Sequence, residues 1–141
     1  VNQAINSPFE NLGLEVNYEK NVGEHFSYSL GTDISNPKSR DAGKWTRKFA
    51  REQYTASLKY NNRDFTASLA GSMTADRAGG WKDRLPLNLY TSYQLSKDHR
   101  IDLVCENILN RKDLVGNWSN ANSTRYYSLP RNIRLTYTYT F

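Results

Sequence analysis

The sequence predicts an all-β protein in which about seven long antiparallel strands run up and down in chain order. Apolar and polar residues alternate with a period of two in seven segments, whereas a helix would place apolar residues three or four positions apart. Connections between the segments are alternately short and long. No apolar run approaches the roughly 20 residues that a transmembrane helix needs. With 141 residues, we expect one domain over positions 1–141.

The apolar positions of the seven segments lie on one face of each predicted strand. All but Thr32, Gly71 and Thr91 are apolar, and none is charged. The alternate face is almost entirely polar. Taking every second residue, the apolar series run over Leu12–Tyr18, Phe26–Ile34, Tyr54–Tyr60, Phe65–Met73, Leu85–Leu95, Ile101–Cys105 and Ile133–Phe141.

The connections indicate a membrane barrel. Short turns rich in Asn, Asp and Gly, which suit tight hairpins, lie near 21–23, 61–64 and 96–99. Long connections cover about 35–52, 74–84 and 110–131. Outer-membrane barrels have short periplasmic turns and long external loops. If Phe141 lies on the periplasmic side, all three long connections fall outside the cell.

Strand length favours a membrane barrel over a soluble antiparallel sandwich or small barrel, which also alternates. Several alternations run for about nine to eleven residues, as membrane-spanning strands do, whereas soluble strands usually have about five or six. The prediction is an antiparallel up-and-down transmembrane β-barrel with its apolar face in lipid and its polar face on the lumen. Seven strands do not complete such a barrel. Residues 1–9 are a weak candidate for an eighth strand, and the chain begins at Val1 without Met, so we expect further strands upstream.

Composition and charge indicate neither an enzyme nor a nucleic-acid-binding protein. The net charge is +5, but the Lys and Arg residues fall mainly in predicted loops and turns. No catalytic or metal-ligating constellation and no cofactor site stand out. Cys105 is expected to face lipid, and His25 and His99 to be solvated at turns. Asp102 and Glu106 are expected to form lumen ion pairs with Arg134 or Lys59.

The long connections hold the candidate ligand-binding residues, because each combines Lys or Arg with Trp or Tyr. Such mixtures suit anionic ligands: iron complexes, haem propionates, or lipopolysaccharide phosphates at the rim. The simpler alternative is that these loops are solvated and contact only lipopolysaccharide at the rim of the barrel. The candidates are Trp45, Arg47, Lys48, Trp81, Trp118, Arg125 and Tyr126.

Two segments resemble the C-terminal end of TonB-dependent outer-membrane receptors. Residues 101–110 (IDLVCENILN) are similar to that family's penultimate strand, an alternating run closed by Glu-Asn, two apolar residues and Asn. Residues 126–141 (YYSLPRNIRLTYTYTF) are similar to its last loop and last strand, which ends on an aromatic residue. The family usually has Pro-Gly-Arg at the end of this loop, whereas here Pro130 is followed directly by Arg131.

The resemblance implies the last seven strands of a 22-stranded barrel in the bacterial outer membrane. Such receptors take up scarce ligands, usually ferric siderophores, haem or cobalamin, with energy from the TonB complex. The plug domain and the TonB-contacting segment are not in this chain. The resemblance also implies that Tyr137, Tyr139 and Phe141 form a signal for the barrel assembly machinery. A passive outer-membrane pore, an adhesion-type barrel and a soluble ligand-binding β protein remain as alternatives.

Overall fold

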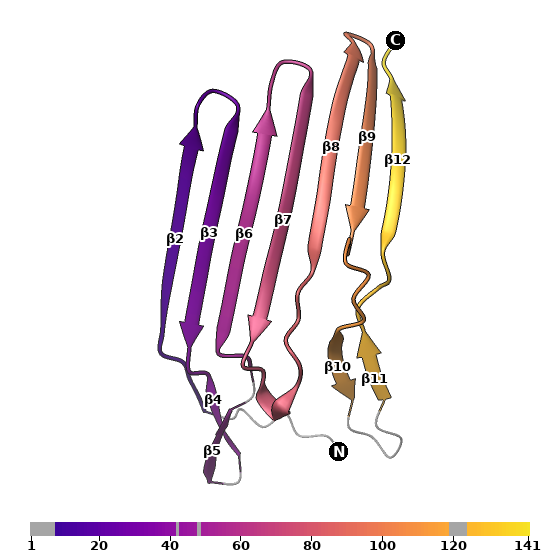
Figure 1. Cartoon of the computed structure of the whole chain (residues 1–141). Helices are drawn as coiled ribbons and strands as arrows, with labels where there is room; N and C mark the ends of the chain where they lie inside the picture. The colour runs from indigo at the N-terminus through magenta and orange to yellow at the C-terminus, as the bar shows by residue number, and fades with distance from the viewer. Residues whose placement is uncertain (1–7, 42, 48, 119–123) are drawn as a thin grey trace.

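The computed structural model describes residues 8–41, 43–47, 49–118 and 124–141, and its main element is a seven-stranded antiparallel sheet (Figure 1). The strands follow one another across the sheet in chain order, which confirms the predicted meander. They are β2 (Gly13–Val22), β3 (Phe26–Ser35), β6 (Glu52–Asn61), β7 (Phe65–Ala75), β8 (Leu87–Ser96), β9 (His99–Glu106) and β12 (Asn132–Tyr139).

The register aligns the apolar series across the sheet. One row of paired residues crosses the five strands from β6 to β12, as Leu58, Leu69, Leu89, Cys105 and Ile133. A slip of one residue would move a whole apolar series to the opposite face, so the alternation specifies this register strongly.

The short turns all lie at one end of the sheet and the long connections at the other (Figure 1). Gly23 closes the first turn with a φ of 66°, a backbone conformation that favours glycine. In the second turn the Asn62 side-chain oxygen accepts hydrogen bonds from the backbone N–H groups of Asp64 and Phe65, at 3.0 and 2.8 Å. This is the local role in which Asn is favoured in turns.

The long connections contain structure that the alternation did not predict. The first holds β4 (Lys38–Asp41) and β5 (Lys44–Arg47), which form a hairpin that also pairs with β1 (Phe9–Glu10). The second contains η1, a 3-10 turn (Ala78–Gly80), and the third holds the hairpin of β10 (Leu114–Trp118) and β11 (Thr124–Tyr127). Phe9 and Glu10 therefore pair with β4 and not with the seven-stranded sheet, while the remaining candidates for an eighth strand, residues 1–7, lie outside the described residues.

The fifth predicted strand begins two residues later than expected, at Leu87. Leu85 donates its backbone N–H to the side chain of Asp113 in another connection, at 3.0 Å. Pro86 has no N–H to donate, although its carbonyl still accepts a hydrogen bond from Ser72 at 3.1 Å. The strand pairing therefore starts only after the proline.

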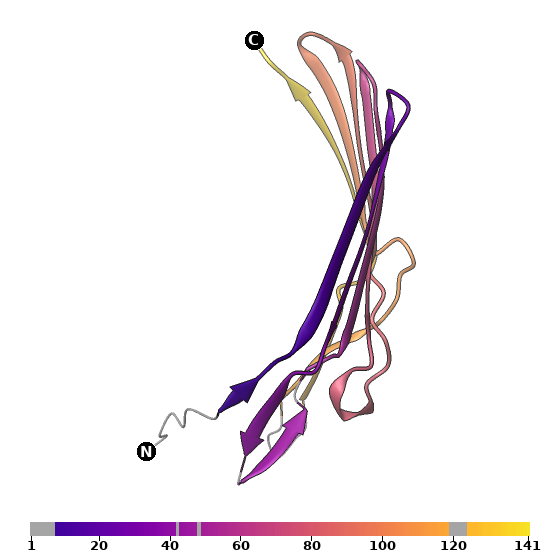
Figure 2. The same cartoon turned by 90° about the vertical axis from the view of Figure 1, so that its left-hand side faces the viewer.

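The sheet is a single curved layer with no interior of its own (Figure 2). Among the described residues only Pro37, Ala75 and Asp113 are buried, the last two at 6% and 9% exposure. No helix in the described part of the chain is long and apolar enough to cross a membrane. An isolated layer of this kind leaves both faces open, so each face must meet a solvent or a partner that suits its side chains.

Candidate functional site

The apolar face of the sheet is fully uncovered. Large apolar side chains remain between about 40% and 70% exposed on most of its strands, for example 64% for Leu14, 49% for Leu58 and 70% for Leu135, whereas those of β9 are half-buried. Contiguous exposed apolar surface on this scale marks an interaction site for a membrane or a protein. The whole apolar face is therefore the first candidate functional surface.

The hydrogen-bond register indicates that this apolar face is the convex one. The Asn36 amide donates to the Leu12 carbonyl at 2.9 Å, so the backbone polar groups of Leu12 point toward β3. Because these groups alternate in direction along an antiparallel strand, Leu14 and every second residue after it on β2 also direct their N–H and C=O groups at β3. In Figure 1 β2 runs upward with β3 on its right, and an L-residue bonded toward the right then directs its side chain at the viewer. Figure 2 shows the sheet bowed with its hollow side away from that viewer. We infer that Leu14 and its apolar row lie on the outside of the curve.

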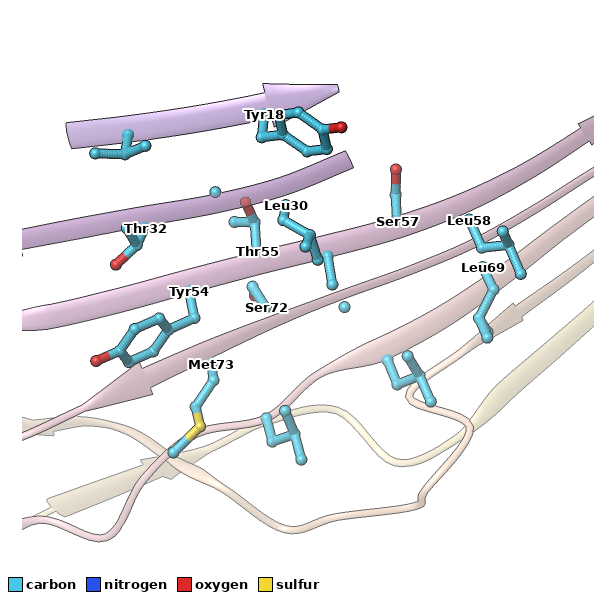
Figure 3. Close-up of a pocket in the computed structure, with 16 residues that line it drawn as sticks. Tyr18, Leu30, Thr32, Tyr54, Thr55, Ser57, Leu58, Leu69, Ser72 and Met73 are labelled. Carbon is cyan, nitrogen blue, oxygen red and sulfur yellow. The ribbon is translucent and has the colours of Figure 1, made fainter. Parts of the chain in front are cut away.

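A shallow hollow lies in the middle of the apolar face (Figure 3). Its floor is the directly paired Ala56 and Gly71, whose small side chains leave a space of about 660 Å³ between larger neighbours. The rim includes side chains from β2, β3, β6 and β7: Tyr18, Leu30, Tyr54, Leu58, Leu69 and Met73. The walls of this hollow offer mainly apolar contact, so the hollow suits hydrocarbon.

Aromatic rings gather at the short-turn end of the same face. The ring centroids of Phe26 and Tyr60 are 4.8 Å apart, those of Tyr60 and Phe65 6.0 Å, and those of Phe65 and Tyr93 6.4 Å. We call Phe26, Tyr60, Phe65 and Tyr93 the aromatic band. Tyr18 does not join it and instead lies 5.9 Å from Tyr28. Aromatic girdles mark the interfaces of membrane barrels.

The last strand carries a second aromatic group at the same end. Tyr137 and Tyr139 lie on β12, and Phe141 follows its end with its ring 5.0 Å from that of Tyr139. His99 contacts this group: its Nδ1 lies 2.5 Å from the Tyr137 hydroxyl and its ring 4.8 Å from that of Tyr139. The predicted assembly residues are therefore adjacent, and His99 is a contact of aromatic rings and not simply a solvated turn residue. His25 likewise contacts Asn61 and Tyr60.

The opposite, concave face carries small polar side chains and scattered charges. Ser29 and Ser57 share a hydrogen bond of 2.8 Å in its middle. Asp102 forms its ion pair with Arg100 at 3.0 Å, and Glu106 accepts a hydrogen bond from Asn132 at 3.2 Å. The expected pairing of these two carboxylates with Arg134 or Lys59 is therefore wrong, because the nearer partners lie on the same strand or directly opposite in the register.

The basic β4–β5 hairpin bends toward the concave side of the sheet (Figure 2). Its Trp45 is 45% exposed, as a ligand contact would require. Arg47 instead lies 2.6 Å from Asp76, at the end of β7, and donates to the Arg77 carbonyl at 3.4 Å. The hydrogen bond from Arg47 holds the pKa of the Asp76 carboxyl below its ordinary value. Arg47 thus joins the hairpin to the next long connection. Lys48, another predicted ligand residue, lies outside the described residues.

The second and third long connections are joined by a polar network. The Asp113 carboxylate accepts hydrogen bonds from the Leu85 amide and from Arg111 Nε, both at 3.0 Å. Arg111 also donates to the Asp83 carbonyl at 3.0 Å, and Arg77 donates to the Leu114 carbonyl at 2.6 Å. These links fix the two connections relative to each other, and sequence inspection alone gave no sign of them.

Between these two connections lies a polar hollow of about 750 Å³, which we call the loop hollow. It brings together two predicted ligand-binding residues, Trp81 and Arg125. It also includes Lys82, next to Trp81 in the sequence, and three residues that were not ligand candidates: Arg111, Lys112 and Tyr127. Of the other candidates, Tyr126 is exposed on β11 outside this lining, and the Trp118 side chain is not among the described ones.

No group of three or more His, Cys, Asp or Glu side chains within the described residues has a geometry suited to a metal ion. Cys105 is half-buried and lies in the apolar row between Leu89 and Ile133. The chain matches no family model, no curated protein and no solved structure.

Proposed function

We propose that this chain forms part of the wall of a bacterial outer-membrane β-barrel, with its convex apolar face in lipid and its concave polar face on the lumen. The proposal is supported by the exposure of the apolar side chains on one face of the sheet and by the inference that this face is the convex one. A soluble barrel has the opposite arrangement, because its apolar face fills the closed interior.

The strand lengths support the same proposal. A strand of ten residues such as β2 or β6 spans about 33 Å, at roughly 3.3 Å per residue. A tilt of about 45° leaves roughly 23 Å along the membrane normal, close to the ~25 Å apolar band of outer-membrane barrels. The aromatic band at the short-turn end lies where the periplasmic interface would be.

The sheet edges indicate that this wall is incomplete. Among the described residues, no strand pairs with the outer edge of β2 or of β12. An unpaired backbone group in hydrocarbon costs several kcal/mol, so open edges are not stable in a bilayer. We infer that further strands pair with these edges, in keeping with a larger, 22-stranded barrel.

Within that class we propose active uptake of a scarce ligand, such as a ferric siderophore, haem or cobalamin, by a TonB-dependent receptor. The support is the resemblance of residues 101–110 and 126–141 to the end of such receptors, together with Lys, Arg and Trp in the long connections. The plug domain and the contact with TonB belong to segments outside this chain.

Two experiments on the full-length protein test these proposals in turn. A membrane barrel is extracted only with detergent, and its unboiled form migrates differently from the boiled form on a gel. A protein that stays monodisperse in plain buffer would contradict the membrane assignment. For transport, uptake of radiolabelled iron complexes by cells with and without the protein is compared. Loss of uptake on adding a protonophore supports active transport, whereas unaffected entry indicates a passive pore.

A further inference from the structure

Hydrogen bonds join the two connections that form the sides of the loop hollow. The Asp113 carboxylate accepts a hydrogen bond from the Leu85 amide, and Arg111 donates to the Asp83 carbonyl. Arg77 donates to the Leu114 carbonyl across the hollow and to the Lys82 carbonyl within its own connection. Its volume of about 750 Å³ lies within the range of small-molecule sites, roughly 300 to 1,000 Å³. A bare inorganic ion would fill only a small part of it.

The lining has an excess of positive charge. Arg111 is neutralised by Asp113 at 3.0 Å. The remaining charged side chains of the lining are the cations Lys82, Lys112 and Arg125 and a single carboxylate, that of Asp83. Within the part of the chain that the structure describes, no carboxylate oxygen lies within 4.0 Å of the charged nitrogens of these three cations. Unpaired cations around one hollow attract an anionic ligand.

Two of the hollow's rings have a cation on one face. Arg77 lies 4.8 Å from the centroid of the Trp81 ring, and Lys112 lies 4.7 Å from that of Tyr127. Arg77 is also engaged by the carbonyls of Leu114 and Lys82, whereas the contact with Tyr127 holds Lys112 in place and leaves its N–H groups available to a ligand. Guanidinium and ammonium groups then bind phosphate or carboxylate through charge-assisted hydrogen bonds.

We propose that the loop hollow binds the phosphate or carboxylate group of an organic anion, through Lys82, Lys112 and Arg125, with Trp81 and Tyr127 contacting its carbon skeleton. The inference rests on the proposed function only in placing the hollow on the external side of the barrel. The same anionic chemistry has two possible sources: a free solute or the headgroup of a membrane lipid.

The test uses the full-length protein in a zwitterionic detergent. Citrate and glycerol 3-phosphate serve as free organic anions and are titrated by calorimetry. Mixed micelles with phosphatidylglycerol serve as the lipid source, with phosphatidylcholine micelles as their reference, and binding is followed by tryptophan fluorescence. Binding is compared between the wild type, the double variant K82Q/R125Q and the control K38Q/K44Q, which removes the same charge from the β4–β5 hairpin.

We expect at least one anionic probe to bind, with K82Q/R125Q weakening it about tenfold or more and K38Q/K44Q leaving it within about twofold. Binding of citrate or glycerol 3-phosphate identifies a free solute, and binding of phosphatidylglycerol alone identifies a lipid headgroup. If no probe binds the wild type, or if both double variants weaken binding equally, the proposal is wrong. Heat-modifiable migration of the same samples reports the barrel separately, so a failed anion site is distinguishable from a failed membrane assignment.

Discussion

Charge placed at the centre of β7 should discriminate between the two faces of the sheet. Leu69 lies mid-strand on the apolar face, 38% exposed, and pairs with Leu58 and Leu89. Its neighbour Ala70 lies on the opposite face, where it pairs with Ser57 and Asn88. The substitutions Leu69→Arg and Ala70→Arg therefore introduce the same charge one residue apart, which the proposed barrel places against lipid in the first case and against the polar lumen in the second.

The magnitude follows from the cost of arginine in a bilayer. Roughly 2–4 kcal/mol is expected at the midplane, which corresponds to about a 30- to 900-fold change in the folding equilibrium constant. A lumen-facing arginine keeps water around its guanidinium group and should cost under about 1 kcal/mol.

The assay is equilibrium unfolding of the full-length protein in phospholipid vesicles, with denaturant titration followed by heat-modifiable gel migration. Wild type, Leu69→Arg and Ala70→Arg are compared under identical conditions. Equal destabilisation by the two variants, or a larger loss for Ala70→Arg, would refute the assignment of the apolar face to lipid.

Three further predictions concern the connections. Asp113→Ala leaves Arg111 and the Leu85 amide without their partner, which costs about 1.5–3 kcal/mol locally; limited trypsin cleavage at Arg111 or Lys112 should rise roughly ten- to hundredfold, and an unchanged rate would show that the network does not hold the loops. Because the pKa of Asp76 is lower in the folded protein than its ordinary value of 3.8, its pairing with Arg47 stabilises the hairpin above that pH and is lost as the pH falls through the lowered folded value; acid titration of Trp fluorescence should show a transition below pH 3.8 that Asp76→Asn lacks. Gly23→Val forces a branched side chain into positive φ and should destabilise the first turn by about 1–2 kcal/mol, whereas Gly23→Asn should be tolerated, as unfolding titrations will show.

The strands were predictable from sequence because their periodicity is local. Each of the seven segments carries its own alternation, and the chain order of the strands follows from short turns such as Asn21–Gly23 and Asn61–Asp64. Two boundaries were off by two residues. The fifth strand was expected from Leu85, because the alternation continues through Pro86 although the ladder does not, and the last was expected to reach Phe141 but ends at Tyr139. A period-two pattern of apolar side chains does not reveal that Pro86 lacks the backbone N–H that the strand pairing needs.

The inner structure of the long connections could not be predicted in the same way. The β4–β5 and β10–β11 hairpins are short, and β4 and β5 are charged, so their alternation gives no apolar face to detect. The network around Asp113 joins residues about 15 to 30 positions apart, and such contacts depend on how two connections lie side by side.

The candidate ligand residues were recognised by type but not by role. Arg47 belongs to a cationic stretch, yet its contact with Asp76 makes it a brace between two connections. Lys112 and Tyr127, which sequence reasoning passed over, form a cation–ring pair in the loop hollow. Residue type therefore singled out the connections that hold Trp81 and Arg125, whereas the contacts of individual side chains depend on the pairing of distant segments.

The most direct measurement determines whether lipid or water contacts each face of one strand. Single cysteines are introduced by Leu69→Cys or Ala70→Cys in a Cys105→Ala background, and each is given a nitroxide label in vesicle-embedded full-length protein. An apolar face in lipid predicts that the label at position 69 collides with oxygen dissolved in the acyl chains, while the label at position 70 collides with a water-soluble nickel complex. Equal nickel accessibility at both positions, or the reverse pattern, would contradict the membrane-facing assignment.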